Sequence, residues 1–424
     1  MRLLLITTDN YPEFGTTSGI FNKLLLNGAF LEKFDTVSVL TLKYDVCQLE
    51  YEKVRGVNIY RATYGSLLPI KKCLRNYKQI KFLDFTQIIW TKIYNKLQML
   101  TNKKEPAFLN REIVNCLSKK LHEIDAGSYD YIVPIFGNYA SIAAIIANEP
   151  QNAKVVAYQV DPCSTNWTIT QAEKKLLENF EKEMYKKADA IITMPVIYKD
   201  IQQLITEDIK DKFYPMELPL IVEPKLENEE RNENKKLKCV FSGLIYGGIR
   251  DPLYTLKLFE KLVELEDVEL HLVGVTKEEL PDEFRDSKIV CYGRVLADEA
   301  QKIMNSADVL VNIGNLMNNQ LPSKIFDYIS LGKPIVNVCK NRDCPTLPYM
   351  EKYPLSLNLF EEYELLELQK EQLTQFLADS KGNRLEFAEV EKLFENATPK
   401  YCADYIYNLL VSLQDKEATD TIQE

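Results

Sequence analysis

Short, almost continuously apolar runs alternate with longer amphipathic stretches from the first residues of the chain. The apolar runs of the first half, which predict strands, are residues 3–8, 37–41, 131–135, 154–160 and 190–194. Helices are predicted between them at 18–32, 108–123, 139–148 and 171–187. Strands that are apolar on both faces are typical of parallel sheets covered by helices on both sides. The alternation therefore predicts an α/β fold built from β–α–β units.

A polar stretch rich in Glu, Asn and Lys, residues 217–237, interrupts this pattern and predicts a linker. The strands predicted after it are 238–242, 269–274, 288–293, 309–313 and 334–339. The helices predicted after it are 251–265, 298–306, 323–331, 362–378 and 400–414. We therefore predict two Rossmann-like domains facing a central cleft. They are an N-terminal domain at 1–216 and a C-terminal domain at 238–398, and a C-terminal helix and tail at 399–424 returns to the first domain.

Composition narrows the chemistry that such a fold could carry. With 52 basic and 62 acidic residues the net charge is -10, which disfavours nucleic-acid binding by bulk charge. Only two histidines are present, so a histidine-rich metal site or a Ser-His-Asp triad is not expected. Nine scattered cysteines without a C-x-x-C pair indicate reduced thiols in the cytoplasm. Carboxylates and fixed cations are left to act on a substrate, and no bound metal is expected.

One basic segment stands apart in this acidic chain. Residues 71–104 contain nine Lys or Arg and a single acid, Asp84. Apolar residues recur between these charges at close to helical spacing, which predicts an amphipathic helix. Such a helix either lies on an anionic membrane surface or packs its apolar face on its own domain. No run approaches the length of about 20 apolar residues that spans a bilayer, so any membrane contact is expected to be peripheral.

Two loops that follow predicted strands contain glycines next to a helix start. TTDNYPEFGTTSGIF at 7–21 includes Gly19, and FSGLIYGGIRDP at 241–252 includes Gly243 and Arg250. Ligands of open parallel sheets bind beyond the carboxyl ends of the strands, where small residues let backbone N–H groups approach a phosphate. An arginine there suits a diphosphate because its planar fork donates two parallel bonds. The alternatives are an ordinary turn and a surface arginine.

A third segment, residues 307–338, places a strand, a polar loop and then the start of a helix at Pro322, Ser323 and Lys324. Proline at the first helical position is expected to leave an exposed helix N-terminus, to which Lys324 adds a full charge. Lys324 and Asp327, three residues apart, share one helix face. This arrangement suits phosphate against the lysine and ribose hydroxyls against the aspartate. A capped helix with a local ion pair is the alternative.

Taken together, these segments resemble the GT-B glycosyltransferases of the family 4 type (glycosyl transferases group 1). The resemblance rests on the two loops above, on VELHLVG, on YGRVLADEAQKIMNSADVLVNIGN and above all on LPSKIFDYISLGKPIV. It covers the second half of the chain and, more loosely, the first. It implies a retaining enzyme that transfers a sugar from a nucleoside diphosphate sugar, with no cofactor and no bound metal.

The resemblance also assigns roles to residues of the donor site. Arg250 and Lys324 would hold the donor diphosphate and act in catalysis by stabilising the leaving group, and Asp327 would bind the ribose. The remaining donor residues that it implies are Gly19, Gly243, Gly293, Arg294, Val295, Asn315, Asn319, Gln320 and Ser323. Two positions depart from the family pattern. Asn319 stands where an acid is often found, and Leu244 stands where an arginine frequently follows the glycine.

Candidate acceptor residues follow the strands of the first half. AYQVDPCSTN at 157–166 places Asp161 at the carboxyl end of a strand, where a carboxylate could position or deprotonate an acceptor hydroxyl. A turn before a proline is its alternative. Asn10, Tyr11, Phe136 and Asn138 occupy comparable positions.

We therefore expect a metal-independent hexosyltransferase that takes a UDP-sugar as donor. The expected acceptor is a glycan, a lipid-linked molecule or another hydroxyl compound, and the expected setting is cell-surface polysaccharide assembly at the cytoplasmic side of the membrane. Two alternatives remain open. One is a nucleotide-sugar epimerase of the same fold, and the other is a catalytically silent GT-B partner subunit.

Overall fold

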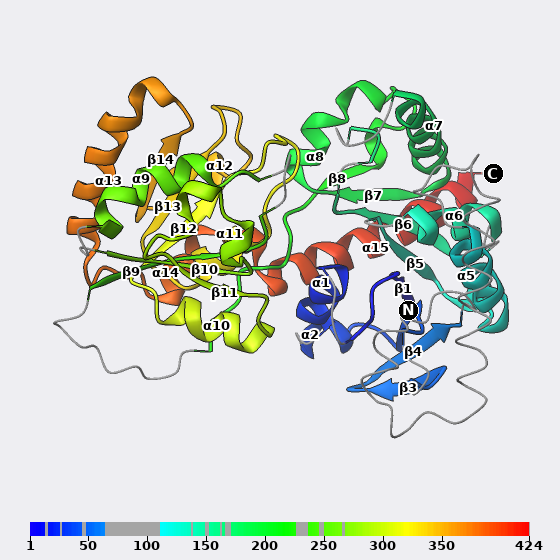
Figure 1. Ribbon diagram of the computed structural model, residues 1–424. Coiled ribbons are helices and arrows are strands. Elements are labelled where there is room, and N and C mark those ends of the chain that lie inside the picture. The colour runs from blue at the N-terminus through cyan, green and yellow to red at the C-terminus, as the bar shows by residue number, and fades with distance from the viewer. Residues whose placement is uncertain are drawn as a thin grey trace, which may run out of the picture. The chain divides into compact units, whose positions relative to one another are not determined.

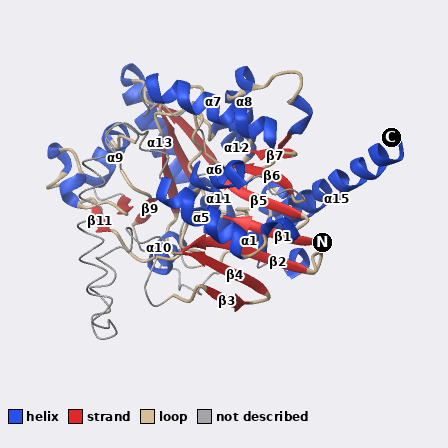
Figure 2. Cartoon of the chain, turned by 90° about the vertical axis from the view of Figure 1, so that its right-hand side faces the viewer, coloured by secondary structure: helices blue, strands red, loops and turns tan. Residues whose placement is uncertain are grey.

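The structure is a computed structural model that describes residues 1–12, 16–25, 28–44, 48–63, 111–136, 139–148, 152–161, 163–165, 171–225, 236–245, 250–264 and 268–423. The chain forms two compact units. The first unit comprises Met1–Pro219 together with Pro399–Glu424, and the second comprises Leu220–Thr398. Each unit is an α/β sandwich in which helices flank a largely parallel sheet, as Figures 1 and 2 show.

An eight-stranded sheet forms the centre of the first unit. Its strands are β1 (Arg2–Ile6), β2 (Thr36–Leu42), β3 (Tyr51–Val54), β4 (Val57–Ala62), β5 (Tyr131–Phe136), β6 (Lys154–Gln159), β7 (Ala190–Thr193) and β8 (Phe213–Pro215). The spatial order is β3-β4-β2-β1-β5-β6-β7-β8, and all neighbours are parallel except β3 and β4. The helices are α1 (Thr16–Leu25), α2 (Gly28–Leu31), α5 (Arg111–Glu123), α6 (Tyr139–Asn148), α7 (Gln171–Lys187), α8 (Pro195–Asp200) and α15 (Pro399–Gln423).

A six-stranded, all-parallel sheet forms the centre of the second unit. Its strands are β9 (Leu237–Ser242), β10 (Val268–Val273), β11 (Val290–Gly293), β12 (Val309–Ile313), β13 (Ile335–Cys339) and β14 (Ser356–Phe360). Their spatial order is β11-β10-β9-β12-β13-β14. The helices are α9 (Leu253–Glu264), α10 (Ala297–Asn305), α11 (Lys324–Ser330), α12 (Leu347–Lys352), α13 (Leu366–Ser380) and α14 (Phe387–Leu393).

The predicted α/β class with two Rossmann-like domains is confirmed, and each of the predicted strands is present. Buried apolar side chains on both faces explain why: β7, β12 and β13 are buried at every position. The strands that the pattern missed are β3, β4, β8 and β14. In β3 and β14 exposed or half-buried residues dominate, which weakens the apolar signal of an edge strand.

The predicted return of the C-terminal helix to the first unit is also confirmed. Figure 1 shows α15 in red beside the sheet of the first unit. The Tyr131 hydroxyl of β5 donates to the carbonyl of Leu410 at 2.6 Å, and Lys33 forms an ion pair with Asp404 at 2.6 Å. The helix thus joins the first unit through a buried hydrogen bond and a charged contact.

The linker predicted at 217–237 is divided between several parts of the structure. Residues 217–219 belong to the first unit, 220–225 belong to the second, and Leu237 is the first residue of β9. Residues 226–235 lie outside the described ones, as does the whole basic segment at 71–104. In the part of the chain that the structure describes, no helix combines the length and the apolar character that crossing a membrane requires.

Candidate functional site

Both sheets contain the doubly wound strand order, which fixes where a ligand is expected. In the second unit, β9 begins the sheet, β10 and β11 extend it to one side, and β12, β13 and β14 extend it to the other. The connections diverge between β9 and β12, so their carboxyl ends form a topological switch point, where open α/β sheets bind ligands. In the first unit, β1 and β5 form the corresponding switch point. The loops after these four strands are the candidate sites.

Glycines gather at the carboxyl edge of the second sheet. Gly243, Gly274, Gly293 and Gly314 come directly after, or end, four strands that lie side by side. A Cβ on Gly274, which has φ +95°, would lie 2.5 Å from the carbonyl oxygen of Gly243. A Cβ on Gly314 would lie 2.9 Å from the carbonyl oxygen of Val338. No larger residue fits these positions without a backbone shift, so glycine is needed where the neighbouring loops of this edge approach one another.

Arg250 lies at the switch point of the second unit and is held by Asn315. Its Nε and Nη2 donate to Asn315 Oδ1 at 3.0 and 2.7 Å, and its Nη1 donates to the Leu244 carbonyl at 3.3 Å. Asn315, which is buried, follows β12, whereas Arg250 follows β9. The pair therefore bridges the two loops that diverge at the switch point. Leu244, which departs from the family pattern, supplies a backbone acceptor to this arginine.

The glycine at 243 makes room for this arginine. A Cβ at that position would lie 2.9 Å from Arg250 Nη1 and 2.9 Å from Cζ of Phe241. The guanidinium also lies over the Phe241 ring, 5.9 Å from its centroid. A side chain at 243 would therefore require the arginine or the Phe241 ring to shift from its observed position.

The helix predicted to hold phosphate and ribose begins with an ion pair. Helix α11 starts at Lys324, two residues after Pro322, so the proline is not at the first helical position as expected. Ser323 is exposed and its side chain makes no capping hydrogen bond to this helix. Lys324 Nζ lies 2.9 Å from Asp327 Oδ2, and the two side chains are 43% and 29% exposed. The ion pair is present, and it places both side chains together at the helix start.

A buried tyrosine that the sequence analysis did not single out joins α11 to the end of β9. The Tyr328 hydroxyl accepts the N–H of Ser242 at 2.7 Å and donates to the carbonyl of the same residue at 3.2 Å. Tyr328 is 1% exposed. Because Ser242 precedes Gly243, this hydroxyl fixes the glycine loop relative to the helix that carries Lys324. The sequence indicates this role only through the position of the tyrosine in an apolar helical run. A tyrosine that is buried there needs a hydrogen-bond partner for its hydroxyl.

The other predicted donor residues occupy the same edge or the loop beside it. Gly293 ends β11 with φ +62°, Arg294 is exposed, and Val295 is half-buried. The amide Nδ2 of Asn315 donates to the Gln320 carbonyl at 3.2 Å, which closes the loop that contains Asn319. Asn319 and Gln320 are half-buried.

In the first unit, the predicted acceptor residue Asp161 has a raised pKa. It follows β6 by two residues and is partly buried. Burial raises its pKa to about 6, and the negative charge of Asp9, which follows β1, adds to the rise. A carboxylate with such a pKa can accept a proton near neutral pH.

The loop that contains Asp161 is anchored by a buried glutamate. Glu181 of α7 accepts hydrogen bonds from the N–H and the hydroxyl of Ser164, the former at 3.2 Å. Gln159 Nε2 donates to it at 3.2 Å, and the Tyr185 hydroxyl lies 3.4 Å away. Burial raises the pKa of Glu181, while its bonds to Ser164 oppose the rise. This network fixes both ends of the stretch 159–164.

The loop after β1 and the helix that follows it contain three predicted site residues: Asn10, Tyr11 and Gly19. Asn10 is buried, and its Oδ1 accepts a bond from Gln48 Nε2 at 2.7 Å. Gly19 lies inside α1, where an added Cβ would meet nothing within 4 Å. The N–H of Ser18 donates to the Asp9 carboxylate at 3.1 Å, so the protein's own carboxylate binds at this helix start. Tyr11 is buried beside Phe21, in an edge-on ring contact at 6.5 Å.

Phe136 is the last residue of β5, and Asn138 lies outside the described residues.

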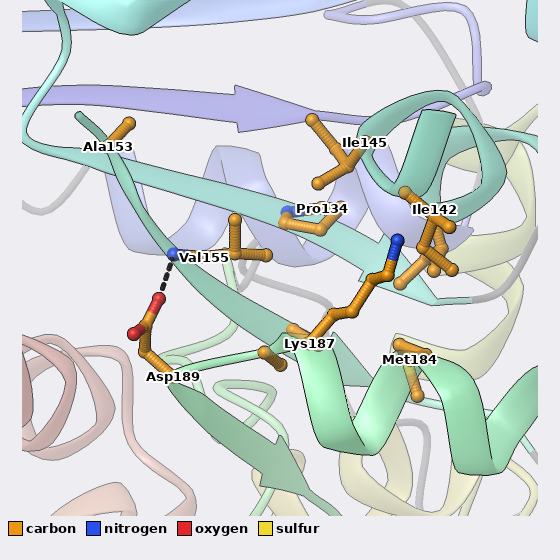
Figure 3. Close-up of a pocket in the computed structure, with 11 residues that line it drawn as sticks. Pro134, Ile142, Ile145, Ala153, Val155, Met184, Lys187 and Asp189 are labelled. Atoms are coloured by element: carbon orange, nitrogen blue, oxygen red, sulfur yellow. Dashed lines mark hydrogen bonds between the residues drawn. The ribbon is translucent and has the colours of Figure 1, made fainter. Parts of the chain in front are cut away.

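A separate cavity of about 360 Å³ lies on the sheet of this unit, between α6 and α7 (Figure 3). Its apolar walls include Ile142 and Met184, and the side chain of Lys187 extends toward Ile142. None of the predicted site residues lines it. In the described ranges, the structure brings together no group of three His, Cys, Asp or Glu side chains that could hold a metal ion.

Comparison with known proteins shows which structures share this fold. No protein-family model matches the chain, and no curated protein matches it. Solved structures do match over nearly the whole length. TarM of S. aureus, in complex with fondaparinux, α-GlcNAc-glycerol and UDP, has 11% identity and a TM-score of 0.58, covering 97% of this chain and 99% of its own. The α,α-trehalose 6-phosphate synthase of Burkholderia multivorans has 11% identity and a TM-score of 0.56, covering 100% and 98%.

An α-glucosyltransferase in complex with UDP and a 13-mer DNA has 10% identity and a TM-score of 0.53, covering 97% of this chain and 100% of its own. At such identities the likeness concerns the fold. The chain therefore has the two-domain, Rossmann-like architecture that GT-B glycosyltransferases adopt.

Proposed function

We propose that this protein is a glycosyltransferase of the GT-B class that transfers a hexose from a UDP-sugar to a hydroxyl acceptor with retention of configuration. The observation that carries the proposal is the grouping at the switch point of the second unit. Arg250 is held by Asn315 in the loops after β9 and β12, and the Lys324–Asp327 pair lies at the start of α11, which Tyr328 ties to the end of β9. Two cations and one carboxylate at a glycine-lined sheet edge suit a nucleoside diphosphate.

In this proposal the second unit binds the donor. Arg250 and Lys324 stabilise the charge that develops on the leaving diphosphate, and no metal ion is required. Asp327 accepts hydrogen bonds from the ribose hydroxyls. Backbone at Gly293–Val295 contacts the base, and Asn319 and Gln320 contact the sugar. Matching structures that contain UDP support the choice of nucleotide.

The first unit binds the acceptor in this proposal, through Asp161 and the loop that contains Asn10 and Tyr11. Asp161 positions or deprotonates the acceptor hydroxyl. The acceptor is a glycan, a lipid-linked molecule or another hydroxyl compound of cell-surface polysaccharide assembly, reached from the cytoplasm. Residues 71–104 provide peripheral contact with the membrane in this proposal. These parts rest on the sequence and its resemblance to family 4.

Calorimetric titration of UDP into Lys324→Ala and Asp327→Ala tests the donor site. Asp327→Ala should weaken UDP binding by roughly 1.5–3 kcal/mol, because bonds from the ribose to a charged acceptor are lost. Lys324→Ala should lower the transfer rate by about a hundredfold, because a charge interaction that strengthens in the transition state is removed. UDP affinity equal to that of the parent in both variants would refute the assignment.

Incubation of the parent protein with UDP-sugars without acceptor separates the three kinds of activity. A transferase releases UDP slowly, a nucleotide-sugar epimerase interconverts the sugars, and a silent partner subunit does neither. A panel of UDP-, GDP- and ADP-sugars in a thermal shift assay identifies the donor, since saturating ligand at about 100 times its Kd adds about 2.7 kcal/mol of stability.

A further inference from the structure

A second cavity in the first unit contains one of the predicted acceptor residues and an arginine that the sequence analysis passed over. It has a volume of about 280 Å³. Tyr11, from the loop after β1, and Asn22 of α1 line one side. Arg55, in the turn between β3 and β4, lines the other. Leu25, Val57 and Ile59 form apolar walls.

Tyr11 is held in place by its backbone, while its hydroxyl is left available. Its N–H donates to the Asp9 carbonyl at 2.9 Å, and its carbonyl accepts from Arg61 Nη2 at 3.4 Å. The residue is only 4% exposed, yet the hydroxyl makes no hydrogen bond to the described part of the chain. Burial raises the pKa of this phenol to about 12, so it remains a donor at neutral pH. The oxygen is not one of the fully enclosed, unpaired side-chain atoms of the described chain, so its proton is available to a ligand oxygen in the cavity that Tyr11 lines.

Arg55 occupies a backbone position that disfavours it. Its φ is +49° and that of Gly56 is +87°, the conformation of a tight hairpin turn in which asparagine or glycine is preferred at the first position. Its guanidinium forms no ion pair or hydrogen bond with the residues that the structure describes. The acidic Glu52 of the same hairpin pairs with Arg61. The positive charge of Arg55 is close enough to act on the Tyr11 phenol.

We infer that this cavity is a binding site for a small ligand that has an oxyanion, a phosphate or a carboxylate, attached to an apolar body. The guanidinium of Arg55 and the hydroxyl of Tyr11 would donate to the oxyanion, because an arginine fork matches the geometry of both groups. The walls of Leu25, Val57 and Ile59 would contact the body of the ligand. The site includes Tyr11, which the proposed function assigns to the acceptor, but all of its residues belong to the first unit, so binding of an oxyanion here does not require the proposed UDP-sugar donor.

Phenyl phosphate is a suitable probe because it combines an aromatic ring with a dianion, and benzyl alcohol is its uncharged counterpart. Both are titrated into the full-length protein by calorimetry. The parent should bind phenyl phosphate at least about tenfold more tightly than benzyl alcohol, because the alcohol lacks the charge-assisted bonds. Saturating UDP should leave this binding unchanged.

Two variants and one matched control locate the site. Arg55→Asn removes the charge and keeps a residue that accepts a positive φ, so the fold should be retained or stabilised. It should weaken phenyl phosphate binding by about tenfold or more, and Tyr11→Phe should weaken it by about threefold. Lys53→Asn removes the same charge from an exposed position of the same hairpin that does not line the cavity. It should change the affinity by less than about twofold.

Three results would overturn the inference. The first is the absence of saturable phenyl phosphate binding by the parent up to about 20 mM, a weak limit even for a ligand of this size. The second is equal binding of benzyl alcohol, which would mean that the cavity recognises only an apolar body. The third is an equal loss in Lys53→Asn, which would mean that the hairpin attracts anions by general charge. Failure of UDP to bind would refute the proposed function and leave this result intact.

Discussion

The substitution Gly243→Ala tests whether Arg250 is used for donor binding, because it acts on the arginine through one added methyl group. The new Cβ would lie 2.9 Å from Arg250 Nη1, and a shift of the guanidinium that relieves this contact would disturb its bonds to Asn315 and Leu244. A displaced arginine loses its charge-assisted bonds to the diphosphate, worth about 1.5–3 kcal/mol. We therefore expect UDP to bind roughly 10- to 100-fold more weakly.

The same methyl group also lies 2.9 Å from the buried ring of Phe241. Overpacking of this kind should lower the free energy of unfolding by about 1–3 kcal/mol. Chemical denaturation measures that loss, and calorimetric titration of UDP measures the affinity. The two effects are separated in an Arg250→Ala background. There, Gly243→Ala should still lower stability but should weaken UDP binding no further, because the arginine is already gone.

Gly19→Ala adds the same methyl group in the first unit, at a glycine that the resemblance assigns to the donor. An added Cβ there meets nothing within 4 Å, and the residue lies inside α1. Alanine in a helix is favoured over glycine, so the variant should gain about 0.5–1 kcal/mol of stability, and its UDP affinity tests the donor contact that the resemblance implies. Parental UDP affinity in Gly243→Ala, or an additive loss in the double variant, would contradict the role given to Arg250. A loss in Gly19→Ala would show that the donor approaches that glycine.

Two further variants concern the first unit. The folded pKa of Asp161 lies above its usual value, so the native state binds the extra proton and stability falls as pH rises from about 4 to about 6. Asp161→Asn should remove this pH dependence of stability, as urea titrations would show, and should add at most about 3 kcal/mol of stability at pH 7. The transfer rate of the parent should increase as the pH rises through about 6. Glu181→Ala leaves the Ser164 N–H and hydroxyl without their acceptor, so it should lower the free energy of unfolding by about 2–4 kcal/mol. It should also slow transfer, because the loop of Asp161 is no longer anchored. Thermal denaturation and initial rates measure the two effects. Unaltered stability of Glu181→Ala would contradict the anchoring role.

The strands and the loops at their carboxyl ends could be predicted because their physical signal is local. A strand buried on both faces is apolar at successive positions, and β12 and β13 are of this kind. The glycines and cations that follow such strands can be read directly from the sequence. The hairpin of β3 and β4 could not, because β3 alternates exposed and half-buried residues. Its turn carries Arg55, so this arginine was passed over together with the hairpin.

The partners of the site residues were not predictable, because they depend on which strands are neighbours. The resemblance places Asn315 among the donor residues, but the spacing of the sequence does not indicate that β12 lies next to β9. The structure places its amide against Arg250, which is 65 residues away in the chain. The link from Tyr328 to Ser242 spans 86 residues and depends on the same adjacency. Helix patterns identify a buried tyrosine, but only the topology identifies its acceptor.

The ion pair at the start of α11 decides how a change at Asp327 should be interpreted. In the free protein Asp327 pairs with Lys324, so Asp327→Ala has two opposing effects on UDP binding. It frees the lysine for the diphosphate, and it removes the bonds to the ribose. A half-buried pair three residues apart on a helix contributes only about 0.5 kcal/mol, because solvent still screens it. The lost bonds to a charged acceptor are worth roughly 1.5–3 kcal/mol, so the loss exceeds the gain and the net result is weaker binding. Tighter UDP binding by Asp327→Ala would mean that this carboxylate serves only to hold Lys324.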